Sequence, residues 1–136
     1  MKRNATAVWK GTLKEGNGSL TTQSKVLDNS QYSYKTRFED GIGTNPEELI
    51  AAAHAGCFTM QLSAYIAEAG FEVTSVETKC DVDLQEGSIV SSHLNVKAQI
   101  PGLDEAKFQE LVTKAETGCI ISRLLNTKIS SEAKLN

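Results

Sequence analysis

Cysteine, histidine and proline are all scarce in this sequence of 136 residues. The three cysteines, Cys57, Cys80 and Cys119, lie far apart, whereas the ligands of a structural zinc site typically come in closely spaced pairs. Only His54 and His93 could add to them as ligands. The odd and sparse cysteine count also argues against a disulfide-bonded scaffold. We therefore expect three free thiols and no metal site.

The chain also has no large excess of positive or negative charge. The chain has 14 Lys and Arg against 17 Asp and Glu, and no basic cluster that could follow a nucleic-acid backbone. The best apolar stretch, residues 49–60, is interrupted by His54 and falls short of the roughly 20 residues of a membrane span. No apolar segment of a secretory signal follows the N-terminus. We therefore expect a cytoplasmic protein that binds neither nucleic acid nor a membrane.

The composition is that of an ordinary globular chain, and the length predicts a single domain over residues 1–136. Two-residue alternation predicts strands over residues 6–13, 32–38, 71–84, 88–100 and 126–135. Turns are predicted at Asn17-Gly18 and at Glu86-Gly87, because such pairs readily adopt positive φ. Helical spacing predicts one helix over 46–69 and another after Asp104 that ends at Gly118.

The helix predicted over 46–69 is apolar on nearly all sides. Thr44 or Asn45 can cap it, Pro46 suits its first position, and Gly70 can end it. A helix of this kind is surrounded by protein, but one sheet of a chain this short covers only one side. We therefore predict an obligate homodimer of α+β class, with mainly antiparallel sheets packed around two long central helices.

Cys57 lies in the middle of this helix, and His54, three residues earlier, could stand on the same face. A buried free cysteine is often simply part of the core, and Cys119 after the second helix admits that interpretation as well. A Cys–His pair would instead indicate a thiol hydrolase, although no third residue completes a triad. Cys80, within a predicted strand, is given no role.

Residues 36–39 and 43–58 carry a resemblance to a known family. An Asn-Pro-Glu-x-Leu start followed by Ala-Ala-x-x-Ala-x-Cys-Phe resembles the osmotically inducible protein OsmC and organic hydroperoxide resistance (Ohr) family. The sequence of residues 54–60 is closer to the OsmC branch than to the Ohr branch. The predicted order of helices and strands matches that of the family along essentially the whole chain. The resemblance implies an intertwined homodimer and a thiol peroxidase that uses two cysteines, without metal, haem or another cofactor.

By this resemblance, Cys57 attacks the peroxide and Cys119 resolves the product. Arg37, otherwise a solvated strand residue, would activate the thiolate, and Glu47, otherwise a first-turn glutamate favoured by the helix dipole, would hold Arg37 in a bidentate pair. A sulfenic acid on Cys57 would condense with Cys119 to a disulfide, which a dithiol such as a lipoyl group reduces. Family members commonly place proline directly after the resolving cysteine, where this chain has Ile120.

Helix geometry restricts where these residues can meet. Ten residues separate Glu47 from Cys57, which is about 15 Å along a helix axis, so one straight helix cannot place both in one site. Two antiparallel helices in a dimer could do so, which predicts a site shared between subunits. Apolar walls would favour organic hydroperoxides over hydrogen peroxide. We expect the walls to be formed by Ile42, Phe58, Met60 and the aromatic residues of 32–38.

A different class of function also fits the same fold. In that alternative the protein is a dimeric, non-catalytic binding protein for small molecules, and Cys57 only packs in the core.

Overall fold

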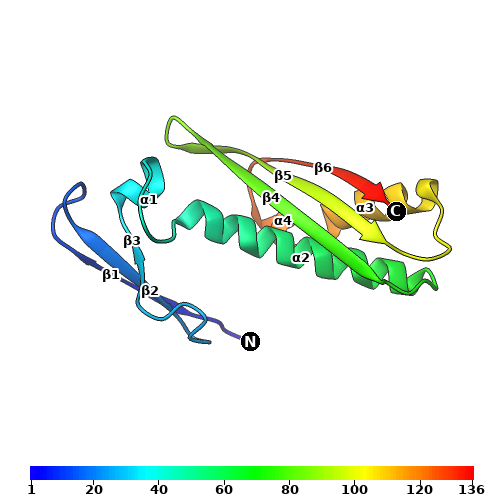
Figure 1. The fold of residues 1–136 in the computed structure, drawn as a ribbon, viewed down its shortest axis with the longest axis horizontal. Coiled ribbons are helices and arrows are strands. Elements are labelled where there is room, and N and C mark those ends of the chain that lie inside the picture. The colour runs from blue at the N-terminus through cyan, green and yellow to red at the C-terminus, as the bar shows by residue number, and fades with distance from the viewer. The chain divides into compact units, whose positions relative to one another are not determined.

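The computed structural model describes all 136 residues, which form two compact units, Met1–Leu49 and Ile50–Asn136 (Figure 1). Each unit has a three-stranded sheet of its own, in the order β1-β2-β3 in the first and β4-β5-β6 in the second. The long helix α2 (Pro46–Glu68) begins in the first unit and continues through the second. The single domain expected from the length stays a prediction.

Strands β1 (Ala5–Lys10) and β2 (Asn17–Thr22) form the predicted hairpin, but the turn lies elsewhere. The loop covers residues 11–16, and the Asn-Gly pair expected in the turn lies within β2. Gly18 is needed there because a Cβ atom would lie 2.7 Å from the ring of Trp9 and 2.5 Å from that of Tyr32, its partners on both sides. The glycine thus makes room for cross-strand aromatic packing.

The strand predicted over 32–38 is wrong for most of its length. Strand β3 (Ser30–Tyr32) is short, and the chain then forms helix α1 (Tyr34–Phe38). Ser33 Oγ accepts a hydrogen bond from the Thr36 N–H, and Thr36 Oγ1 accepts one from the Ser33 N–H. This reciprocal capping box starts a helix despite the alternating pattern of side chains, so Arg37 lies on a helix rather than a strand.

The second unit contains the predicted long hairpin. Strands β4 (Ser75–Gln85) and β5 (Ser88–Gln99) are antiparallel and meet at Glu86 and Gly87, both with positive φ. Strand β6 (Lys128–Leu135), however, pairs with β5 in parallel, so this sheet is mixed and not antiparallel as predicted. Parallel neighbours need a long crossover, and the helices between β5 and β6 supply it.

Helix α3 (Glu105–Gly118) has the predicted ends. The Asp104 side chain accepts a hydrogen bond from the Lys107 N–H at 2.9 Å and so caps the first turn. A further helix, α4 (Ile120–Leu124), follows after one residue and was not predicted. That residue is Cys119, which ends α3 and begins α4.

Helix α2 also starts as predicted, since Asn45 Oδ1 accepts a hydrogen bond from the Glu48 N–H at 2.8 Å. Gly70 follows the helix with φ +89°.

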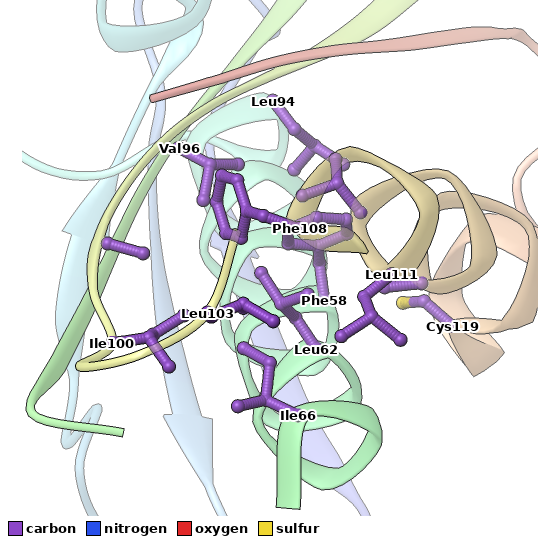
Figure 2. Close-up of a cluster of buried hydrophobic side chains, with 13 residues drawn as sticks. Phe58, Leu62, Ile66, Leu94, Val96, Ile100, Leu103, Phe108, Leu111 and Cys119 are labelled. Carbon is purple, nitrogen blue, oxygen red and sulfur yellow. The ribbon is translucent and has the colours of Figure 1, made fainter. Parts of the chain in front are cut away.

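Only one face of α2 is buried within the chain. Side chains from this face, from β5 and from α3 form the core in Figure 2, among them Phe58, Leu62, Ile66, Leu94, Val96, Phe108 and Leu111. The other face is apolar but exposed, and we call it the α2 outer face: Ala52, Ala53, Gly56, Met60 and Ala64.

By length and composition alone, α2 could cross a membrane, contrary to the expectation from the sequence. It has 23 residues, and an 18-residue window has a mean hydropathy of 1.3, with 22% of that window buried. Core helices of globular proteins have the same properties. The buried His54 side chain, hydrogen-bonded at both ring nitrogens, lies with Phe58 on the core-facing side of α2.

Candidate functional site

Two of the three cysteines lie side by side in the second unit. Cys57 is half-buried on α2, and Cys119 is fully buried at the break between α3 and α4. The Cys57 thiol lies close enough to the Cys119 thiol to raise its pKa. Both are reduced in this structure. The fold therefore brings together the two sulfurs that the family resemblance pairs.

The position of Cys119 is held by the backbone on both sides. Its N–H donates to the Ala115 carbonyl at 3.0 Å, and its carbonyl accepts from the Arg123 N–H at 3.0 Å. The preceding Gly118 permits a close approach of α2, because a Cβ atom there would lie 2.6 Å from the Tyr65 hydroxyl. Two helix ends and a tight contact with α2 thus fix Cys119 beside Cys57.

Burial is the main influence on the ionisation of Cys119. It raises the pKa of this thiol, and the neighbouring Cys57 thiol raises it further. The nearby polar groups of Ser122 and Ile121 lower that pKa by less. The net shift is upward, so Cys119 is a protonated thiol at neutral pH.

An open hollow of about 580 Å³ lies beside Cys57. Its other walls come from α2 and α4, namely Met60, Gln61, Ala64, Ile120 and Ile121. Met60 is where the sequence predicted it, but Phe58 is not, because its side chain is fully buried in the core. Ile42 belongs to the first unit and is 88% exposed. Most of the wall is nevertheless apolar, as expected.

Arg37 and Glu47 form an ion pair within the first unit. Glu47 is buried, and its Oε1 accepts a hydrogen bond from Arg37 Nε at 3.0 Å and lies 2.9 Å from Arg37 Nη2. The expected Arg37–Glu47 pair forms, but both guanidinium nitrogens approach the same carboxylate oxygen. Glu47 Oε2 is buried without any hydrogen-bond partner in the chain. A buried carboxylate oxygen in this state has room for one more donor.

A small hollow of about 80 Å³ lies beside the Arg37 guanidinium in the first unit. It is lined mainly by aromatic and apolar side chains: Trp9, Leu13, Tyr32, Tyr34, Phe38 and Pro46. The guanidinium also lies over the Phe38 ring, 5.4 Å from its centroid. Arg37 is thus held by a carboxylate and an aromatic ring, while its side chain remains 44% exposed.

His54 does not pair with Cys57, contrary to the possibility left open by their spacing. Its Nδ1 lies 2.6 Å from Ser92 Oγ and its Nε2 2.7 Å from Ser122 Oγ. Cys80, to which the sequence assigned no role, lies 3.2 Å from Ser92 Oγ. Burial lowers the pKa of His54, and the charge of Glu116 only partly opposes this shift. A thiol hydrolase built on Cys57 and His54 therefore has no geometric support.

Known proteins resemble this chain along most of its length. Residues 39–134 match the family of OsmC-like proteins. The chain is 42% identical over 133 residues to peroxiredoxin OsmC of Escherichia coli (strain K12), covering 95% of this chain and 93% of that protein. The chain belongs to the OsmC family. Its likeness to the organic hydroperoxide resistance protein OhrB of Bacillus subtilis (strain 168) is lower, at 31% over 123 residues, covering 87% and 88% of the two chains.

Solved structures show the same fold. An OsmC-like protein of unknown function from Vibrio cholerae superposes on this chain with a TM-score of 0.76 at 15% sequence identity, covering 98% of this chain and 99% of that one. The higher identity to the E. coli OsmC protein than to OhrB agrees with the predicted place in the OsmC branch.

The backbone at Cys119 suits a proline at the next position. Cys119 has φ −60° and ψ 130°, a conformation favoured before proline, and Ile120 is the first residue of α4 and 69% exposed. We expect Ile120→Pro to raise the free energy of unfolding by about 0.4–1 kcal/mol, because the unfolded chain loses freedom. Urea unfolding of the reduced protein measures this.

Arg123→Pro is the matched control in the same helix. It removes the N–H that donates to the Cys119 carbonyl, and should therefore cost about 3 kcal/mol. An Ile120→Pro variant destabilised as much as this control would show that the backbone at Cys119 does not accept proline.

Proposed function

We propose that this protein is a thiol peroxidase that reduces organic hydroperoxides through Cys57 and Cys119. The main support is the contact between a half-buried thiol, at the edge of an apolar hollow, and a fully buried second thiol. The names of the relatives point the same way, since one is called a peroxiredoxin and another an organic hydroperoxide resistance protein.

In the first step the Cys57 thiolate attacks the terminal oxygen of the hydroperoxide. The O–O bond breaks, the alkoxide takes up a proton and leaves as the alcohol, and Cys57 becomes a sulfenic acid. A thiolate is required, and the positive charge of Arg37, oriented by Glu47, is the group we assign to stabilise it. Arginine suits this role because it stays charged and offers several donors.

In the second step the Cys119 sulfur attacks the Cys57 sulfur. An S–S bond forms, the S–O bond breaks, and water is released. A dithiol then reduces the disulfide and is itself oxidised, and a lipoyl group is the kind of reductant we propose. Because Cys119 is already in contact with Cys57, the sulfenic acid is captured before further oxidation.

Counting thiols tests this proposal. The reduced chain has three free thiols, and a slight excess of cumene hydroperoxide should remove two of them. Cys57→Ser should abolish the loss, because no sulfenic acid forms, while Cys80→Ser should still lose two. The count is made with a chromogenic thiol reagent after the peroxide is removed. If the wild-type protein keeps all three thiols, the alternative of a non-catalytic binding protein is favoured.

We further propose that two copies of the chain share each site. The α2 outer face is apolar, and Gly56 within it has open space around it in the single chain, so a second α2 could pack closely there. Glu47 Oε2 also has no donor in its own chain. In the proposed homodimer the Arg37–Glu47 pair of one chain acts on Cys57 of the other.

Mixed dimers test the sharing. A dimer of one Cys57→Ser chain and one Glu47→Ala chain, carrying different affinity tags, should regain about half of the wild-type peroxidase activity. One of its sites would then combine an intact Cys57 with an intact Glu47. Glu48→Ala, which changes the neighbouring exposed carboxylate, is the matched control and should stay active. An inactive mixed dimer would refute the shared site.

The apolar wall beside Cys57 predicts a preference among peroxides. Burying about two methylene groups of an alkyl hydroperoxide against it should contribute about 1.6 kcal/mol, so kcat/KM for cumene hydroperoxide should exceed that for hydrogen peroxide more than tenfold. Ile120→Gln, which places an amide in the wall from α4 and leaves the α2 outer face unchanged, should reduce the ratio. Stopped-flow rates with both peroxides measure it, and equal rates in the wild type would contradict the prediction.

A further inference from the structure

A buried network of polar side chains begins next to Cys119. Ser122, three residues after Cys119 in the first turn of α4, lies close enough to the Cys119 sulfur to lower its pKa, and its Oγ lies 2.7 Å from His54 Nε2. His54 Nδ1 lies 2.6 Å from Ser92 Oγ, which lies 3.2 Å from the sulfur of Cys80. His54 and Ser92 are fully buried, and Ser122 nearly so. The reaction as described above uses none of the three.

The second step of that reaction has a requirement that this network meets. A thiol must lose its proton to attack a sulfenic acid, and Cys119 is held in its protonated form by burial, which raises its pKa. None of the groups that influence this pKa is a cation. Cys119 therefore needs a proton acceptor close by, whereas Arg37 is assigned to Cys57.

His54 has the properties of such an acceptor. Burial lowers the pKa of His54, so the ring is neutral at neutral pH and one nitrogen carries a free lone pair. With its proton on Nδ1, the ring donates to Ser92 Oγ and accepts at Nε2 from the Ser122 hydroxyl. That hydroxyl can then accept the proton of the Cys119 thiol as it passes its own proton to Nε2.

We propose that His54 accepts the proton of Cys119 through the Ser122 hydroxyl while the disulfide forms. The inference rests on the proposed peroxidase function. The proton moves from the Cys119 sulfur to Ser122 as the Ser122 proton moves to His54, and the Cys119 sulfur attacks Cys57. The S–O bond breaks, the hydroxide takes up a proton to become water, and His54 returns its proton to solvent. No oxidant beyond the hydroperoxide is needed.

The groups around His54 define the expected pH dependence. Besides Ser92 of β5 and Ser122 of α4, Cys80 of β4 lies 3.8 Å from Nδ1, and Glu116 of α3 acts on the ring by its charge. Because the pKa of His54 lies below its ordinary 6.5, the base is already in its neutral form from about pH 6.5 upward. The rate of disulfide formation should therefore be nearly constant between about pH 6.5 and 8, and fall only at lower pH.

A single-turnover experiment tests the inference. Reduced protein is mixed with one equivalent of cumene hydroperoxide and quenched at intervals, and mass spectrometry follows first the sulfenic acid and then the disulfide. The variants are His54→Gln and Ser122→Ala, and His93→Gln is the matched control because His93 bonds only Ser130, on the neighbouring β6. Circular dichroism checks that each variant is folded.

In both variants the rate of disulfide formation should fall by about 100-fold at pH 7, which is the lower end of the rate acceleration that a general base provides. The loss should shrink as the pH rises to about 9, because the small fraction of Cys119 that ionises unaided grows about tenfold per pH unit. His93→Gln should leave both stages unchanged. A second stage that is unaffected, or slowed equally at every pH, would overturn the role of His54.

The wild-type protein provides a test that does not depend on a folded variant. A disulfide rate that rises about tenfold per unit between pH 6.5 and 8 would show that Cys119 ionises without a base, and would overturn the inference. A wild-type protein in which neither the sulfenic acid nor the disulfide forms would refute the proposed peroxidase function itself. The two failures are thus distinguishable, because they occur at different stages of one experiment.

Discussion

The contact between the Cys57 and Cys119 thiols is the constraint on which the proposed chemistry depends. A half-buried sulfur on α2 lies against a fully buried sulfur at the break between α3 and α4. Gly118 lets the end of α3 lie close to α2, because a Cβ atom there would lie 2.6 Å from the Tyr65 hydroxyl. One sulfur can thus meet a peroxide while the other is kept within its reach.

Local signals made much of the fold predictable from the sequence. Asn45 capping α2, the turn at Glu86-Gly87 and Asp104 capping α3 each involve residues within three positions of one another. Where local signals competed, the prediction failed, as when the Ser33 capping box formed a helix in a segment with strand-like alternation. The parallel pairing of β6 with β5 could not be predicted, because it depends on how a long crossover packs.

The candidate site, like the fold, contains residues that the sequence identified and residues that it did not. The family resemblance pointed to Cys57 and Cys119, and the structure brings them together, but the resemblance gave no role to Ser122 or His54. The serines that bond His54 are 38 and 68 residues away along the chain, so no spacing pattern could identify them. The sequence did contain one signal: His54 lies four residues before Phe58, in register with the buried face of α2.

The most direct test of the central contact is to identify the disulfide itself. Protein oxidised with one equivalent of an organic hydroperoxide is digested without reduction, and the cross-linked peptides are identified by mass spectrometry. The account predicts one cross-link within the chain, between the Cys57 and Cys119 peptides, with Cys80 still a free thiol. A cross-link from Cys57 to Cys80, or a Cys57 that is oxidised further with Cys119 still reduced, would contradict it.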